Sequence, residues 1–168
     1  MVTMKRFLPL IACLFLVACG GSKTSSADQK AQPDGFEGSS CAVCGMVVDE
    51  QPPPRGQVRH RDGSHRFTCS LGDLRAYVQA PNPLGDPTDI WVEDLGAGWQ
   101  PDDSSYGARP WIAASDASYV VGLERPRVMG LPVASFKEPS AAEAMSKGEG
   151  RKVVTWAQLK ATPFSEAP

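Results

Sequence analysis

Apolar residues recur along this chain in short groups separated by turn-forming residues, and this pattern predicts brief strands and helices. Residues 57–61 and 64–68 flank Asp62 and Gly63, a pair typical of tight turns, so the sequence predicts a β-hairpin here. A further apolar group, residues 89–93, predicts a strand that returns to the hairpin.

A helix is predicted between the hairpin and the returning strand. Ser70 is one of the residue types that cap helix N-termini, and a helix over residues 71–79 would follow it. Leu71, Leu74 and Val78 would share one face of that helix. The first half of the chain is therefore expected to run strand, strand, helix, strand.

The second half of the chain repeats this order. Residues 117–121 and 132–136 predict two strands, and residues 140–147 predict a helix that Gly148–Gly150 ends. Residues 152–156 then predict a last strand. The repeat indicates an α+β chain built of two small tandem ββαβ-type domains, related by a weak internal duplication.

The segment 96–110 is rich in Gly, Pro, Asp and Ser and separates the two halves. We therefore expect the first ββαβ domain over residues 40–97 and the second over residues 98–168. The chain has 15 prolines and 16 glycines in 168 residues, so loops should make up much of both domains.

The N-terminus has the pattern of an export signal. Lys5 and Arg6 precede residues 7–18, which are all apolar or proline and too few to span a bilayer as a permanent helix. We expect residues 1–18 to be a signal peptide. Its loss changes the formal net charge from −2 to −4, because it carries these two cations and no acid. Without a cationic excess or a basic stripe, nucleic acid is not expected as a partner.

Residues 16–19 (Leu-Val-Ala-Cys) resemble the lipobox of bacterial lipoproteins, in which the cysteine is lipidated and becomes the mature first residue. Several acyl chains on Cys19 would anchor the chain stably to a membrane. The alternative is an ordinary signal peptide cut nearby. Residues 19–39 are polar and without periodicity, so they predict a lipidated flexible tether. By resemblance to Gram-negative sorting signals, Gly20 favours the outer membrane.

Cys41, Cys44 and Cys69 are the thiols that remain when Cys13 leaves with the signal and Cys19 is lipidated. An odd number of thiols in an exported protein means that at least one cannot join an internal disulfide. Because the periplasm is oxidising, a free thiol there has a chemical reason to be free. A Cys41–Cys44 disulfide stays open as an alternative.

Two thiols and a thioether stand within the six residues Cys41–Met46 (CAVCGM). Such soft sulfur ligands select Cu(I) or zinc, and a thioether is a poor zinc ligand, so the combination favours Cu(I). Cys44 is the first candidate ligand because a thiolate anchors Cu(I) well. Met46 lies two residues further, where a local turn could aim both at one metal, and Cys41 is a further candidate.

Two other functions fit parts of the same motif. Cys41 and Cys44 have the spacing of a thiol–disulfide oxidoreductase, although the thioredoxin-like βαβ context is missing. Cys41, Cys44 and Cys69 with a histidine would suffice for a structural zinc site, which leaves Met46 unexplained. Serine nucleophile elbows and phosphate-binding glycine loops are absent from the sequence, so the chain is not expected to be an enzyme.

Structural roles are expected for several other conspicuous residues. Cys69 precedes a helix start, where the helix dipole would lower its pKa, but packing against the core is the commoner role of such a residue. His60 and His65 flank the predicted turn and are expected to be surface or structural histidines. The tryptophans are expected to anchor the cores: Trp91, Trp99, Trp111 and Trp156.

Several short motifs follow one another in a set order over nearly all of residues 40–160, after the lipobox at Cys19. They are Cys41–Met46, Phe67–Ser70, Tyr119–Gly122, Val128–Gly130 with Ala134–Phe136, and Val153–Trp156. This ordered set resembles the NosL lipoproteins, accessory copper-delivery proteins for nitrous oxide reductase. The chain departs from the family pattern at Met145, where an aromatic residue is expected, and at Gly148–Gly150, where a plainer glycine pair is expected.

The resemblance implies a protein that binds Cu(I) and delivers it for assembly of the copper centres of nitrous oxide reductase. It implies Met129 as a second ligand beside Cys44, so that copper would be held across the seam between the domains. It also implies a lipid-anchored position on the periplasmic face of a Gram-negative outer membrane. The implied partners are a membrane-bound copper-centre assembly complex and then the reductase.

Overall fold

A computed structural model describes residues 31–103, 105–125, 127, 128 and 130–161. The predicted signal peptide, Cys19, the tether as far as residue 30 and Met129 lie outside the described residues. In chain order the elements are β1 (Gly56–Arg59), β2 (His65–Thr68), α1 (Leu71–Gln79), β3 (Asp89–Glu93), β4 (Trp111–Ala113), a 3₁₀ turn η1 (Ala114–Asp116), β5 (Ser118–Val121), β6 (Ala134–Phe136), α2 (Pro139–Met145), β7 (Lys152–Val154) and α3 (Trp156–Ala161).

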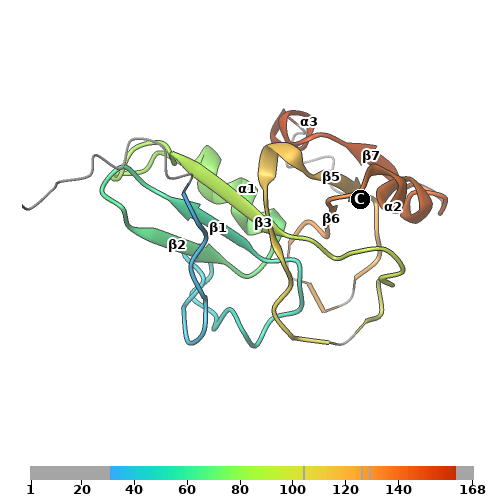
Figure 1. Ribbon diagram of the computed structural model, residues 1–168, viewed down its shortest axis with the longest axis horizontal. Coiled ribbons are helices and arrows are strands. Elements are labelled where there is room, and N and C mark those ends of the chain that lie inside the picture. The colour runs from blue at the N-terminus through green and yellow to red at the C-terminus, as the bar shows by residue number, and fades with distance from the viewer. Residues whose placement is uncertain (1–30, 104, 126, 129, 162–168) are drawn as a thin grey trace, which may run out of the picture. The chain divides into compact units, whose positions relative to one another are not determined.

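The first ββαβ unit, residues 56–93, contributes three strands to an antiparallel sheet of order β2-β1-β3-β4 (Figure 1). The predicted hairpin is confirmed, with Arg59 paired to His65 across the turn. Gly63 takes a φ of +81° in that turn, a conformation that disfavours residues with a Cβ. The sequence analysis does not predict β4, which directly follows the Gly- and Pro-rich segment 96–110 that was assigned to the boundary between the halves.

Helix α1 begins where the sequence predicts it, because Ser70 caps it. The Ser70 hydroxyl oxygen accepts a hydrogen bond from the Asp73 backbone N–H at 3.1 Å. Leu71 and Leu74 are fully buried in one apolar cluster with Val58 of β1, so the predicted apolar face is the one that packs on the sheet.

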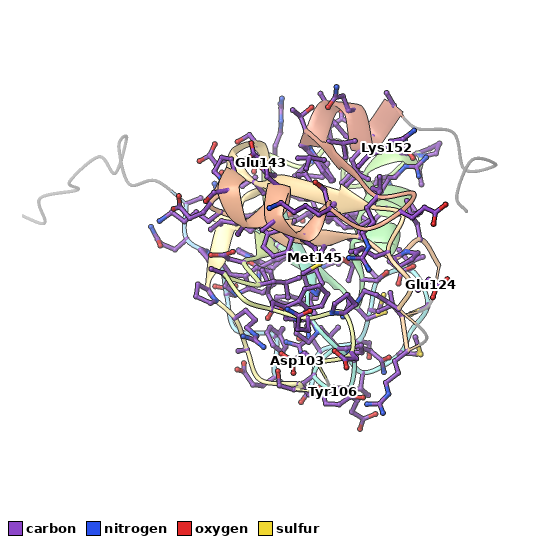
Figure 2. The ribbon with its side chains drawn as sticks, turned by 90° about the vertical axis from the view of Figure 1, so that its right-hand side faces the viewer. Asp103, Tyr106, Glu124, Glu143, Met145 and Lys152 are labelled. Atoms are coloured by element: carbon purple, nitrogen blue, oxygen red, sulfur yellow. The ribbon has the colours of Figure 1, made fainter. Side chains whose placement is uncertain are left out.

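The second ββαβ unit, residues 118–154, forms a separate antiparallel sheet of order β6-β5-β7. Its first strand is the central one, as in the first unit. Helix α2 packs against β5 and β6, and Met145 at its end lies partly buried against their apolar side chains (Figure 2). The predicted α+β class with two ββαβ units is confirmed.

The chain enters a short helix, α3, where the sequence analysis expected the end of a strand. Trp156 was assigned to the strand 152–156, and this assignment is wrong: Trp156 begins α3. The Gln158 N–H donates to Thr155 Oγ1 at 3.3 Å, and Gln158 Oε1 accepts from the Thr155 N–H at 2.8 Å. This reciprocal pair is a capping box, and the Thr-x-x-Gln spacing in the sequence carries the signal for it.

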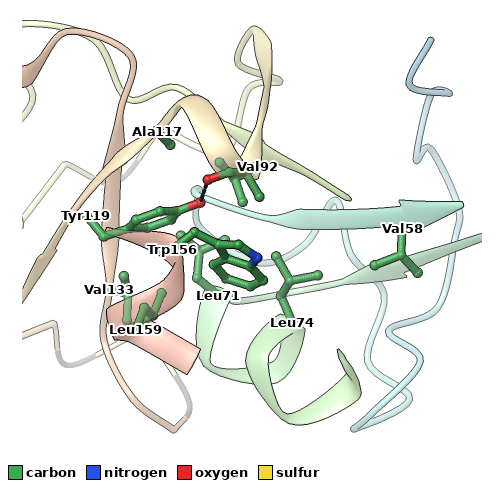
Figure 3. Close-up of a cluster of buried hydrophobic side chains, with 10 residues drawn as sticks. Val58, Leu71, Leu74, Val92, Ala117, Tyr119, Val133, Trp156 and Leu159 are labelled. Carbon is green, nitrogen blue, oxygen red and sulfur yellow. Dashed lines mark hydrogen bonds between the residues drawn. The ribbon is translucent and has the colours of Figure 1, made fainter. Parts of the chain in front are cut away.

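One apolar cluster is shared by the two units. It brings Val58 and Leu74 of the first unit together with Tyr119 and with Leu159 of α3 (Figure 3). The buried Tyr119 hydroxyl donates to the Ala114 carbonyl oxygen at 2.7 Å, the bond drawn in Figure 3. The core is thus continuous between the two sheets.

The tryptophans mostly take the predicted core positions. Trp91, Trp99 and Trp156 are buried. Trp111 is half-buried and packs edge-to-face on Phe36, with ring centroids 6.0 Å apart. Trp99 and Trp156 lie in two different apolar clusters, so a large aromatic side chain contributes to the interior of each.

A buried ion pair ties the segment before β1 to the end of β3. Arg55 Nη1 lies 2.9 Å from Glu93 Oε1, and neither side chain is exposed. The Glu93 carboxylate also accepts from the backbone N–H groups of Arg55 and Arg109, at 2.9 and 3.0 Å. Burial raises the pKa of Glu93, whereas the Arg55 charge and these amides favour its ionised form.

The end of the predicted tether lies against the first sheet. The Gln57 side chain accepts from the Asp34 N–H at 2.9 Å and donates to the Asp34 carbonyl at 2.8 Å. Phe36 is an apolar residue in this otherwise polar stretch and is only 3% exposed, which explains the contact. Within the described ranges, each helix is too short or too polar to cross a bilayer.

Candidate metal centre

The cysteine motif forms a closed loop fixed to β2. The Cys41 N–H donates to the Met46 carbonyl at 2.7 Å, and the Gly45 N–H donates to the Cys41 carbonyl at 2.9 Å. The Ala42 N–H donates to the Phe67 carbonyl of β2 at 2.8 Å, which fixes the loop to the sheet. Gly45 has a φ of +76° with open space around it, so backbone conformation rather than crowding requires glycine there.

Cys69 and Asp73 come from the point where β2 passes into α1. Cys69 directly follows the last residue of β2, and Asp73 lies in the first turn of α1. The Cys69 thiol donates to Asp73 Oδ2 at 3.0 Å. The hydrogen bond from the Asp73 N–H to Ser70 holds the carboxylate at this end of the helix.

Four side chains converge at this place: Cys41, Cys44, Cys69 and Asp73. One donor atom from each lies within 4.8 Å of the other three. Cys44 Sγ is 3.4 Å from Cys69 Sγ, and Cys41 Sγ is 3.5 Å from Asp73 Oδ2. Three sulfur atoms and one carboxylate oxygen make a mainly soft donor set, suited to a thiophilic metal ion.

The cluster has an open side and a closed side. Cys41 and Cys69 are 3% and 4% exposed, and Phe36 and Val48 are buried in the same apolar cluster with them. Cys44 is exposed. A metal ion or a partner protein can therefore reach the cluster through Cys44.

The three thiols differ in how readily they ionise. Hydrogen bonds from the Cys69 thiol and from backbone amides lower the pKa of Cys41 to about 5, although burial acts in the opposite direction. The contact with Cys41, burial and the Asp73 carboxylate raise the pKa of Cys69. Burial raises the pKa of Cys44.

Of the two candidate methionines, Met46 lies beside the cluster. It is partly buried and packs against the apolar side chains around Cys41 and Cys69. Met129 is outside the described residues. The prediction that both are ligands stays a prediction.

The loop that follows Met129 contacts the helix that carries the cluster. A Cβ added to Gly72, in the first turn of α1, would lie 3.0 Å from both the backbone nitrogen and the backbone oxygen of Leu131. Gly72 is thus needed for a close backbone approach beside Asp73. The sequence analysis missed this contact, since a glycine inside a predicted helix gives no hint of its partner.

The two histidines have other partners. His60 Nε2 lies 2.9 Å from the Tyr77 hydroxyl, and His65 Nδ1 lies 3.1 Å from Gln57 Oε1. Both histidines make such contacts away from the thiols, in line with the surface or structural role expected for them. The zinc alternative with a histidine is therefore not formed in the described part of the chain, where Asp73 is the fourth donor.

The described cysteines Cys41, Cys44 and Cys69 are all free thiols, so the Cys41–Cys44 disulfide is not formed. The Cys41–Cys44 pair lies in the loop before β1 and does not open a helix, which is the context a thioredoxin-like motif requires. Cys69 is buried as expected, yet its sulfur faces the other two thiols. The sequence hint for this role is the position of Cys69 between the last residue of β2 and the helix cap Ser70.

Comparisons with known proteins show which family the chain is similar to. A family model described as NosL matches residues 36–163. The chain is 31% identical over 163 residues to the copper-binding lipoprotein NosL of Stutzerimonas stutzeri, with 95% of this chain and 82% of that protein covered. It is 33% identical over 167 residues to the copper-binding lipoprotein NosL of Achromobacter cycloclastes, with the same coverage of 95% and 82%.

The fold is similar to that of a solved structure, the copper chaperone NosL from Shewanella denitrificans. The TM-score is 0.64 at 25% identity, with 77% of this chain and 96% of that chain covered. The names of these relatives describe binding rather than catalysis, in line with the expectation that the chain is not an enzyme.

Proposed function

This chain belongs to the NosL family, and we propose that it holds one cuprous ion at the cluster of Cys41, Cys44 and Cys69 and passes it on. The observation that carries the proposal is the convergence of three cysteine sulfur atoms within 4.8 Å at an exposed edge. Thiolate sulfur selects Cu(I) over magnesium and calcium. The printed names of the relatives support copper as the cargo.

Met46 and Met129 are the proposed thioether ligands. Met46 follows Cys44 by two residues and packs beside the buried thiols. Met129 precedes Leu131 by two residues, and Leu131 contacts Gly72 at the start of the helix that bears Asp73. The support for a thioether from this loop is therefore the contact of the described residue Leu131 with the helix that bears Asp73. Thioether sulfur also favours Cu(I) over zinc.

Release would proceed by ligand exchange at Cys44. A partner's thiol or thioether can approach this exposed sulfur while Cys41 and Cys69 stay covered. Copper then leaves one ligand at a time and is never free in solution. Deprotonation of Cys69 and Cys44 is required on loading, since metal ions bind thiolates, so copper affinity should rise with pH.

The lipoprotein family supports membrane anchoring of the chain. We propose that Cys19 carries the lipid and that the domain faces the periplasm from the outer membrane. The proposed recipients are the copper-centre assembly complex and then nitrous oxide reductase.

An anaerobic Cu(I) titration tests copper binding. The reduced mature chain, which begins at the lipidated Cys19, competes in detergent for Cu(I) with a chelator of known affinity, alongside Cys44→Ala and Met129→Ala. The matched controls are Val43→Ala, an exposed neighbour on the same loop without a donor atom, and Met145→Ala, a thioether on α2 (Figure 2).

We expect one Cu(I) per chain and at least about tenfold weaker binding, or 1.4 kcal/mol, in each site variant. The controls should leave affinity unchanged. Binding no tighter than to a generic thiol would end the proposal. Equal affinity for zinc, with no effect of Met129→Ala, would favour a Cys3Asp zinc site built on Asp73 instead.

A further inference from the structure

Two of the thiols are already in contact. Cys44 Sγ and Cys69 Sγ lie 3.4 Å apart, although the residues are 25 positions apart in sequence. A disulfide has an S–S length of about 2.05 Å, so the atoms need to close by about 1.4 Å. Cys41, the other cysteine of the motif, has its sulfur 3.5 Å from the Asp73 carboxylate.

We propose that oxidation of the metal-free cluster joins Cys44 to Cys69, and that this cross-link closes the metal site. The C-x-x-C pair Cys41–Cys44, which the spacing alone would select, is not the expected disulfide. The consequence for copper rests on the proposed function, whereas the cross-link itself does not.

The order of events follows from exposure. Cys44 is the exposed thiol, and Cys41 and Cys69 are covered, so an incoming disulfide meets Cys44 first. The Cys44 thiolate attacks one sulfur of the oxidant R–S–S–R and forms a mixed disulfide, releasing R–S⁻. Cys69 then attacks the Cys44 sulfur and releases the second R–S⁻. Two thiols lose two electrons in total, the oxidant gains them, and the two protons end on two R–SH molecules.

Cys69 is the better resolving thiol for two reasons. Its sulfur lies 3.4 Å from Cys44 Sγ, whereas Cys41 Sγ is placed within 4.8 Å of the other donor atoms and is 3.5 Å from the Asp73 carboxylate. Cys41, by contrast, is tied into its own loop, where its N–H and carbonyl bond to Met46 and Gly45 within the same turn. The cross-link also joins the loop to the β2–α1 junction, which the Ala42 to Phe67 hydrogen bond already holds together.

The cross-linked form would lack a metal site. Two of the three clustered sulfurs become disulfide sulfurs, which are not thiolates and do not anchor a metal ion. Cys41 is left as a single buried thiol. In an oxidising compartment this gives the empty protein a storage form that rejects metal until a reductant opens it.

Tryptic mapping tests the proposal directly. Cleavage after Lys30, Arg55, Arg66 and Arg75 leaves Cys41 and Cys44 together in peptide 31–55 and Cys69 alone in peptide 67–75. The mature chain, which begins at the lipidated Cys19, is incubated in detergent with oxidised glutathione, its remaining thiols are alkylated, and the peptides are read by mass spectrometry. The same is done for Cys41→Ser, Cys44→Ser and Cys69→Ser, each checked for folding by circular dichroism.

We expect peptides 31–55 and 67–75 to be joined in the wild type and in Cys41→Ser, and to stay separate in Cys44→Ser and Cys69→Ser. A link internal to peptide 31–55 in the wild type overturns the proposal. So does a failure of folded Cys41→Ser to cross-link, or the absence of any disulfide.

Copper retention is measured separately on the reduced and the oxidised chain. Oxidation should lower the fraction of chains that bind Cu(I) at least tenfold, and thiol reduction should restore it. If the reduced chain itself does not bind Cu(I), the proposed function fails while the peptide map still decides the cross-link. If the reduced chain binds and the map shows the other pairing, only the cross-link proposal fails.

Discussion

The two ββαβ units share one topology and differ in chemistry. In each, the first strand is central and the second and third strands flank it, in the orders β2-β1-β3 and β6-β5-β7. In each, two residues separate the second strand from the helix. These are Cys69 and Ser70 in the first unit and Lys137 and Glu138 in the second. A thiol and a cap therefore stand where the other unit has two exposed charged residues.

The first unit is also covered by a segment that has no counterpart in the second. The loop Cys41–Met46 pairs with β2 through the Ala42 N–H and brings Cys41 and Cys44 to Cys69. The junction between β2 and α1, which the repeat also has in the second unit, carries Cys69. The segment before β1 carries Cys41 and Cys44. The candidate metal centre is thus an addition to one copy of a repeat and not a property of the repeat.

The interiors differ as well, and this difference predicts the largest stability effect. The third strand of the first unit ends at Glu93, fully buried against Arg55, whereas that of the second unit ends at Val154. Glu93→Gln leaves the Arg55 guanidinium buried without its counter-charge. Breaking a buried pair in this way costs about 3–5 kcal/mol, so we expect a loss of that order in urea unfolding.

Asp89→Asn is the matched control in the same strand. Asp89 pairs with Arg59 at 2.8 Å, but the two side chains are about one-third exposed. Water screens such a pair, and we expect a loss of at most about 1 kcal/mol. Equal losses for the two variants would show that burial does not set the difference between the pairs.

Two glycines with positive φ, one in each half of the chain, differ in the space around their Cα atoms. Gly122, just after β5, and Gly45, in the cysteine loop, have φ values of +77° and +76°. A Cβ at Gly122 would collide with the Gly150 carbonyl oxygen, whereas a Cβ at Gly45 meets nothing within 4 Å. We expect Gly122→Ala to cost about 2–4 kcal/mol and Gly45→Ala about 1–2 kcal/mol.

Thermal unfolding of the two glycine variants gives the ranking, and copper titration gives a second comparison. Gly45→Ala changes the loop that holds Cys44 and should weaken Cu(I) binding, while Gly122→Ala should leave it unchanged in the folded fraction. The reverse ranking in stability would mean that the Gly150 contact relaxes without cost.

Cys69 and Lys137 are the first residues after the second strand of each unit, and their substitution compares Cu(I) affinity. Cys69→Ser removes one of three clustered sulfurs while keeping a polar side chain of similar size. We expect Cu(I) affinity to fall at least about tenfold, or 1.4 kcal/mol. Lys137→Ser, at the first position after β6, should leave it unchanged. An unchanged affinity in Cys69→Ser would limit the copper ligands to the cysteine loop and the methionines.

Local signals predicted most of the fold. The Asp62-Gly63 turn and the Ser70 cap act over a few residues, and the structure has both where the sequence puts them. The order of elements along each unit was predicted from such signals, whereas the order of the strands within each sheet was not. The sequence analysis missed helix α3, although its signal, Thr155 with Gln158, is equally local. The reason is that Trp156 follows Val154 of β7 at the two-residue spacing of a strand.

The site was less predictable because it depends on contacts between distant residues. That Cys69 joins Cys41 and Cys44 follows from the pairing of Ala42 with Phe67, which the spacing of the cysteines does not contain. The approach of Leu131 to Gly72 is of the same kind. Motif chemistry identified the donor types, and tertiary packing decided which of them meet.

The N-cap residues of α1 and α2 are expected to differ least in their effect on stability. Ser70 accepts a hydrogen bond from the Asp73 N–H, whereas Glu138 makes no side-chain cap bond to α2, which begins with Pro139. Ser70→Ala should therefore cost about 1 kcal/mol in urea unfolding, and Glu138→Ala should stay within about 0.5 kcal/mol of the wild type.

Ser70→Ala also frees the backbone at Asp73, whose carboxylate contacts Cys69, so it should weaken Cu(I) binding slightly as well. If Ser70→Ala lowers stability but leaves copper affinity intact, the cap serves the helix alone. If both variants lose the same stability, the side-chain cap is not what separates the two junctions.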